Sequence, residues 1–75
     1  MSNGADVEMV PVTSSNIKAI GYNGPDRTLY VEFLSGKKYK YADVSPQKHA
    51  ALMATSSHGK HFIAHIRHSH QFEEC

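Results

Sequence analysis

Apolar residues occupy alternate positions through the first half of the chain. In residues 28–34, Leu29, Val31 and Phe33 alternate with Thr28, Tyr30 and Glu32. This period of two is typical of a strand that is buried on one face. Turn-forming residues at 23–26 and 35–36 interrupt this pattern. We therefore predict an antiparallel meander of three to four strands, over residues 9–12, 17–22, 28–34 and 37–41.

The spacing of apolar residues becomes helical after residue 44. Ser45 is a suitable N-cap and Pro46 suits the first helical position, so the pattern predicts a helix of about ten residues. Residues 55–59 should end it, with Gly59 in a loop at positive φ. Phe62 and Ile66 then predict a second short helix that extends to about His68. Strands followed by two short C-terminal helices are typical of an α+β domain.

The 75 residues provide enough apolar side chains for one small core. We expect a flexible N-terminus over residues 1–8, a domain over 9–69 and a flexible C-terminal tail over 70–75. The predicted core consists of Ile17, Ile20, Leu29, Val31, Phe33, Val44, Leu52, Met53, Phe62 and Ile66.

The overall charge is nearly balanced, with 8 Lys and Arg against 7 Asp and Glu, so a basic surface must be local. Apolar runs are too short for a membrane-spanning helix and the first residues do not resemble a signal peptide, so we expect a cytoplasmic protein without a membrane partner. A single cysteine, Cys75, excludes an intramolecular disulfide and a multi-cysteine zinc site.

Histidines are concentrated near the C-terminus. On a helix, His58, His61, His65 and His68 would form one stripe beside basic residues, with no acid before Glu73. The stripe is either a site for a phosphate-bearing ligand or the solvated face of an amphipathic helix. The candidate ligand-binding residues are Lys60, His61, His65, Arg67, His68, Lys38, Lys40, Tyr39, Tyr41, Ser14, Ser15 and Asn16.

Two other kinds of chemistry have weaker support. His61 and His65 could both reach one zinc ion, with His58, His68 or a carboxylate completing the site. The glutamate of zinc proteases is missing, however, and we predict neither a metal site nor a cofactor. Ser14 and Ser15 lie in no nucleophile motif, so we predict no enzymatic activity. Ser14, Ser15 and Asn16 either cap backbone groups in a turn or donate to a phosphate.

Several short segments resemble the KTSC domain. They are Val12-Thr13-Ser14-Ser15-Asn16-Ile17, Gly21-Tyr22, Thr28-Leu29-Tyr30-Val31-Glu32-Phe33, Ser35-Gly36, Tyr39-Lys40-Tyr41, Val44-Ser45-Pro46, Gly59-Lys60-His61-Phe62 and His65-Ile66-Arg67. The family is named for similarity to a small domain at the C-terminus of some lysyl-tRNA synthetases. Its members also occur as stand-alone bacterial and phage proteins, and the resemblance implies RNA binding.

We therefore predict a non-enzymatic module that binds RNA or a nucleotide. The alternative is a protein-protein interaction module, for example a phage inhibitor of a host protein. Tyr30 is on the opposite strand face from Tyr39 and Tyr41, so at least one sheet face should expose tyrosine, which suits either base stacking or a protein interface. The sequence does not determine the oligomeric state.

Overall fold

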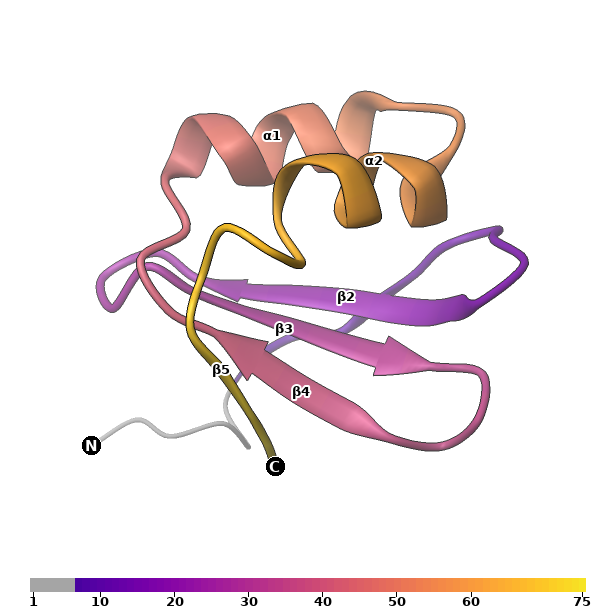
Figure 1. Ribbon diagram of the computed structural model, residues 1–75, viewed down its shortest axis with the longest axis horizontal. Helices are drawn as coiled ribbons and strands as arrows, with labels where there is room; N and C mark the ends of the chain where they lie inside the picture. The colour runs from indigo at the N-terminus through magenta and orange to yellow at the C-terminus, as the bar shows by residue number, and fades with distance from the viewer. Residues whose placement is uncertain (1–6) are drawn as a thin grey trace.

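A computed structural model describes residues 7–75 as an antiparallel sheet with two helices on one face (Figure 1). The sheet contains β1 (Val10–Pro11), β2 (Ile17–Asn23), β3 (Thr28–Phe33), β4 (Lys38–Tyr41) and β5 (Phe72–Glu74), in chain order. Helices α1 (Pro46–Ala54) and α2 (His58–His65) lie side by side above it. The α+β class is confirmed, with five strands in place of the predicted three to four.

Strand parity follows the prediction. Val31 lies opposite Ile20, and Leu29 lies opposite Tyr22 and Tyr41, so these side chains share the face that the helices cover. A β-bulge between Ile17 and Ala19 shifts the register once. The turn between β3 and β4 contains Gly36 at a φ of 97°, a conformation that glycine adopts without a Cβ penalty.

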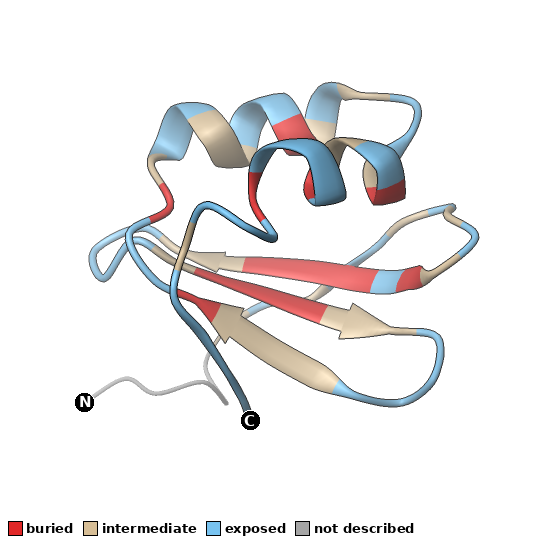
Figure 2. Ribbon diagram, in the orientation of Figure 1, coloured by how far each residue is buried: buried red, intermediate tan, exposed pale blue. Residues whose placement is uncertain are grey.

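Buried residues lie between the sheet and the helices (Figure 2). Eight of the ten predicted core residues belong to this cluster, whereas Phe33 and Met53 are half-buried and pack against its edge. Tyr41 joins the core instead, because its ring packs edge-on against Phe62 with the ring centroids 5.1 Å apart. The buried cluster comprises Ile17, Ile20, Leu29, Val31, Tyr41, Val44, Leu52, Phe62 and Ile66.

The two helices begin differently. Ser45 caps α1 as predicted, since its Oγ accepts a hydrogen bond of 3.2 Å from the Lys48 N–H. Helix α2 begins at His58, where the N-cap residue Ser57 makes no side-chain cap bond. Gly59 is therefore helical, and the expectation that it lies in a loop at positive φ is wrong.

Helix α2 ends at His65, one turn earlier than predicted. The N–H groups of Ile66 and Arg67 both donate to the Phe62 carbonyl at 2.9 Å, which closes the last turn. The chain can then fold back with Ile66 buried in the core. His68 consequently lies in a turn beyond the helix, and the predicted stripe of four histidines on one helix does not form.

Strand β5 was not predicted from the sequence and lies within residues 70–75, where a flexible tail was expected. Its residues Phe72–Glu74 have no apolar alternation, but they pair with the free edge of β4, where Tyr41 lies opposite Phe72. Two flanking hydrogen bonds of 2.9 Å extend the pairing, from Ala42 N–H to the Gln71 carbonyl and from Cys75 N–H to the Lys38 carbonyl. Backbone pairing, which depends little on side-chain pattern, explains why periodicity gave no signal.

The expected flexible N-terminus, residues 1–8, falls mostly on residues 1–6, which lie outside the described residues. None of the helices in the described part of the chain is long and apolar enough to cross a membrane.

Candidate functional site: a groove beside helix α2

Two hollows adjoin beside α2, and they share Asn16 and Ile63 as a common wall. The first, which we call the serine hollow, measures about 390 Å³ and is lined by Thr13, Ser14, Ser15, Asn16, Ser56, Ser57, His58, Gly59, Lys60 and Ile63. The second, the aromatic hollow, measures about 380 Å³ and is lined by Asn16, Phe33, Ser35, Lys37, Tyr39, Tyr41, Phe62, Ile63, Arg67 and Phe72. Together they form what we call the α2 groove.

The loop before β2 forms one wall of the serine hollow through hydrogen bonds centred on Ser14. Its Oγ donates to Asn16 Oδ1 at 3.0 Å and accepts from the Ile17 N–H at 3.2 Å. Asn16 Oδ1 lies directly against Gly59, where any Cβ would collide with it. The turn role predicted for Ser14 is therefore present, and the same interactions hold the loop against the first turn of α2.

The α2 groove is positively charged. Lys60 lines the serine hollow, and Lys37 and Arg67 line the aromatic hollow. Within residues 7–75, no Asp or Glu lines either hollow. Burial raises the pKa of Tyr41, while the positive charge of Arg67 acts in the opposite direction, so Arg67 lies close enough to influence this wall electrostatically. The groove can therefore attract an anion without competition from a carboxylate on its walls.

The structure brings seven of the twelve candidate ligand-binding residues into the α2 groove. They are Ser14, Ser15, Asn16 and Lys60 in the serine hollow, and Tyr39, Tyr41 and Arg67 in the aromatic hollow, with Asn16 shared between the two. The remaining five, Lys38, Lys40, His61, His65 and His68, lie elsewhere.

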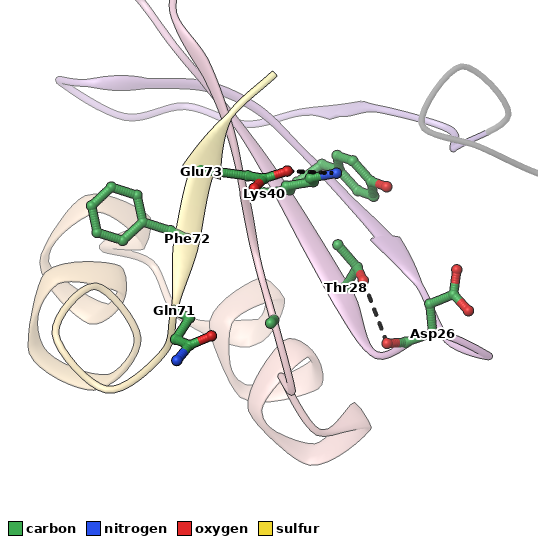
Figure 3. A pocket seen from close by; sticks show the side chains of 8 residues that line it. Asp26, Thr28, Lys40, Gln71, Phe72 and Glu73 are labelled. Atoms are coloured by element: carbon green, nitrogen blue, oxygen red, sulfur yellow. Dashed lines mark hydrogen bonds and ion pairs between the residues drawn. The ribbon is translucent and has the colours of Figure 1, made fainter.

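Lys38 and Lys40 lie on the face of the sheet opposite the helices, because they alternate with Tyr39 and Tyr41. Lys40 Nζ is 3.0 Å from Glu73 Oε2, and the hydrogen bond and charge of Glu73 raise the pKa of Lys40 (Figure 3). This pair lines another hollow, of about 480 Å³, which also contains Asp26 and shares only Phe72 with the α2 groove. Its two carboxylates make it a poorer site for an anion than the α2 groove.

His61 and His65 are adjacent on α2, with ring centroids 4.4 Å apart, and line a hollow of about 510 Å³ next to α1. Burial, followed by the charges of His65 and His58, lowers the pKa of His61. His58 lies instead in the serine hollow, and His68 is exposed beyond the helix end. Across residues 7–75, no group of three or more His, Cys, Asp and Glu side chains is placed to hold a metal ion.

The tyrosines do not form the exposed face that the sequence suggested. Tyr41 is buried beneath α2, and Tyr39 and Tyr22 are half-buried on the same side of the sheet. On the opposite face Tyr30 is only 8% exposed. It lies across from Gly21, where Met9 and Val7 approach closely enough that a Cβ would meet them at 2.6 and 2.7 Å. The chain leading into β1 therefore packs against that face.

Eleven of the eighteen residues that line the α2 groove were absent from the sequence-based candidates, among them Lys37, His58 and Phe72. Strand parity could have found Lys37, since odd positions from 37 to 41 share one face. His58 was considered in the helical stripe and as a possible zinc ligand, and the structure places it beside the loop of Ser14. No local signal points to Phe72, which reaches the groove only because β5 pairs with β4.

Known proteins resemble this chain both in sequence and in structure. The family model of the KTSC domain matches residues 13–72. An uncharacterised protein of Stutzerimonas stutzeri is 38% identical over 56 residues, covering 75% of this chain and 79% of that protein. A protein of Tsukamurella paurometabola is 38% identical over 52 residues, covering 69% and 78% respectively. The crystal structure of a KTSC domain protein from Yersinia pestis matches with a TM-score of 0.87 and 30% identity, covering 92% of this chain and 97% of that one.

Proposed function

The chain belongs to the KTSC domain family, and we propose that it is a non-enzymatic module that binds RNA or a nucleotide in the α2 groove. The observation that carries the proposal is the convergence of Lys37, Lys60 and Arg67 on a groove that no described carboxylate lines. Aromatic side chains in the same groove suit a ligand that combines negative charge with planar rings.

Binding without turnover is supported by the hydrogen bonding of the serines. Ser14 Oγ donates to Asn16, and within residues 7–75 no serine hydroxyl forms a hydrogen bond with a histidine ring. A serine nucleophile requires such a base. We therefore expect nucleotides incubated with the protein to be recovered unchanged. Turnover that is abolished by replacing Ser14 or His58 would contradict this part of the proposal.

Salt dependence provides the main test, because binding at a phosphate releases counterions. If Lys37, Lys60 and Arg67 each contact a phosphate of a single strand, a plot of the logarithm of the binding constant against the logarithm of the salt concentration should have a slope of about −2. This slope corresponds to about a 20-fold loss of affinity between roughly 50 and 200 mM salt. We would measure fluorescence anisotropy of a labelled single-stranded RNA, and titrate unlabelled mononucleotides in competition. A Lys60→Ala, Arg67→Ala variant retains one contact, so its affinity should be lower and should change only about three-fold over the same salt range.

A matched control removes the same charge from the other side of the molecule. Lys18 and Lys38 are outside the groove, so Lys18→Ala, Lys38→Ala should bind within about two-fold of wild type. Equal loss in both double variants would mean that net charge alone attracts the RNA. Wild-type affinity in the Lys60, Arg67 variant would overturn the proposal. Urea unfolding of each variant confirms that the fold is retained.

A protein partner is the second candidate, and the exposed apolar side chains at the groove favour it. Ile63 is 40% exposed and Phe72 is 57% exposed, and both line the aromatic hollow. A partner that buries these side chains would bind with a much weaker salt dependence than RNA. This candidate differs from the exposed tyrosine face predicted from the sequence, since the tyrosines are largely covered.

A further inference from the structure

We propose that Phe72 is a stacking platform for an unpaired nucleobase whose phosphate binds the cations of the α2 groove. This inference rests on the proposed function and specifies the ligand further, because phosphate recognition alone requires no exposed aromatic ring. It assigns a binding role to β5, the strand that the sequence pattern did not reveal.

The Phe72 ring is supported on one side and open on the other. Its centroid lies 5.5 Å from that of Tyr41 at an interplanar angle of 30°, and 5.7 Å from that of Tyr39 at 60°. Nevertheless, 57% of the residue remains exposed. Figure 3 shows the side chain directed away from Lys40 and Thr28, on the other side of β5. The two tyrosines thus fix the position of a ring that still presents surface to a ligand.

The strand that carries Phe72 is fastened on both sides of it. Glu73 pairs with Lys40 at 3.0 Å, and Cys75 N–H donates to the Lys38 carbonyl at 2.9 Å. Before Phe72, the two ring nitrogens of His70 contact the Ala42 carbonyl at 2.8 Å and Lys48 Nζ at 2.9 Å. Because these anchors already order β5, the binding of a ligand to Phe72 would cost the protein chain little additional conformational entropy.

Charge and shape at this position point to a nucleotide unit. Arg67 and Lys37 line the same hollow of about 380 Å³ as Phe72, so one small ligand could place an anionic group near a cation and a planar ring on Phe72. The bases of a duplex are stacked on one another and are not available to a side-chain ring. The required chemistry is therefore a phosphate next to an unpaired base, supplied by a free nucleotide or by a single strand.

The substitution Phe72→Leu tests the ring, because it retains an apolar side chain on β5 and removes the aromatic face. We expect about a ten-fold loss of affinity for single-stranded RNA, as the loss of one stacked base predicts, and near wild-type affinity in Phe72→Trp. Val10→Leu changes another exposed apolar residue, which lies on β1 at the opposite edge of the sheet from β5 and lines neither hollow, and should have no effect. Urea unfolding identifies any variant in which β5 has simply been destabilised.

Four probes separate the possible outcomes: single-stranded RNA, adenosine monophosphate, ribose 5-phosphate and duplex RNA. We expect ribose 5-phosphate and the duplex to bind weakly and with no sensitivity to Phe72→Leu. Tighter binding of the single strand than of the mononucleotide would identify RNA as the source of the base, and equal binding would identify a free nucleotide.

Two results would overturn the inference in distinguishable ways. If ribose 5-phosphate binds as tightly as adenosine monophosphate and Phe72→Leu has wild-type affinity, the groove recognises phosphate alone and the proposed function stands without the stacking role. If none of the four probes binds, the proposed function and the stacking role both fail.

Discussion

Asn16 and Gly59, which lie far apart in the sequence, are in direct contact where the loop before β2 meets the first turn of α2. Asn16 Oδ1 occupies the space that a side chain at position 59 would need, and the Ser14 hydroxyl holds that oxygen in place with a 3.0 Å hydrogen bond. This relationship joins the two segments that form the serine hollow. It also explains a glycine inside a helix, where glycine is otherwise unfavourable.

The contact predicts that Gly59→Ala destabilises the protein, although this substitution within a helix normally stabilises it by about 1 kcal/mol. We expect the free energy of unfolding in urea to fall by about 1 to 3 kcal/mol, the usual cost of inserting a methyl group into a filled space. In an Asn16→Ala background the same change should cost less or should stabilise. Gly24→Ala is the matched control, because its Cβ would meet only Tyr22 Cε2 at 3.9 Å. An equal cost in both backgrounds would show that Asn16 is not the obstacle.

The two helix starts predict different effects of the same substitution. Ser45→Ala removes the oxygen that accepts from the Lys48 N–H, so it should lower the free energy of unfolding by about 1 kcal/mol. Ser57 makes no side-chain cap bond to α2, so Ser57→Ala should change the free energy of unfolding by less than about 0.5 kcal/mol. Equal effects, measured by urea unfolding, would contradict the assigned caps.

Phe62 and Phe33 differ in burial, and we expect their contributions to the free energy of unfolding to differ in the same order. Phe62 is 1% exposed, and Phe62→Ala should cost about 3 to 5 kcal/mol. Phe33 is half-buried at the core edge, with ring centroids 5.9 Å from both Tyr39 and Phe62, so Phe33→Ala should cost clearly less. Chemical denaturation of both variants tests this order. A larger loss for Phe33 would mean that the core is centred nearer the end of β3.

The stability of the protein should decrease as the solution becomes acidic, in part through His49. Burial lowers the pKa of His49 in the folded state, where its ring stacks on Tyr22 at a centroid distance of 4.4 Å. The unfolded chain then binds more protons than the folded one between that lowered pKa and the ordinary value of about 6.5. The contribution of His49 to the stability of the folded protein is therefore complete above about pH 6.5 and is lost as the pH falls through this window.

His49→Gln removes this titration. We would compare urea unfolding at about pH 8 and about pH 5.5, and expect the variant to lose less stability than wild type between the two. His61 contributes in the same direction, because burial and the neighbouring His65 and His58 lower its pKa, so the variant should retain part of the dependence. Identical losses in the variant and wild type would contradict a role for His49.

Features of the fold that depend on neighbouring residues were determined by the sequence itself. The alternation of Leu29, Val31 and Phe33 predicts which face of β3 meets the core, and Ser45-Pro46 predicts where α1 begins. Both signals arise from local geometry, namely the period of a strand and the free N–H groups of a first helical turn. Segments 12–17, 28–33 and 39–41 also carry the family resemblance, and the KTSC assignment confirms it.

The composition of the α2 groove was decided by tertiary structure. Ser14 and Lys60 line one hollow because Asn16 packs on Gly59, and Phe72 reaches Tyr39 because β5 pairs with an open strand edge. The early end of α2 removes His68 from the helix. Such contacts depend on packing and backbone pairing between distant segments, so a local pattern can supply the residue types of a site without showing which of them meet.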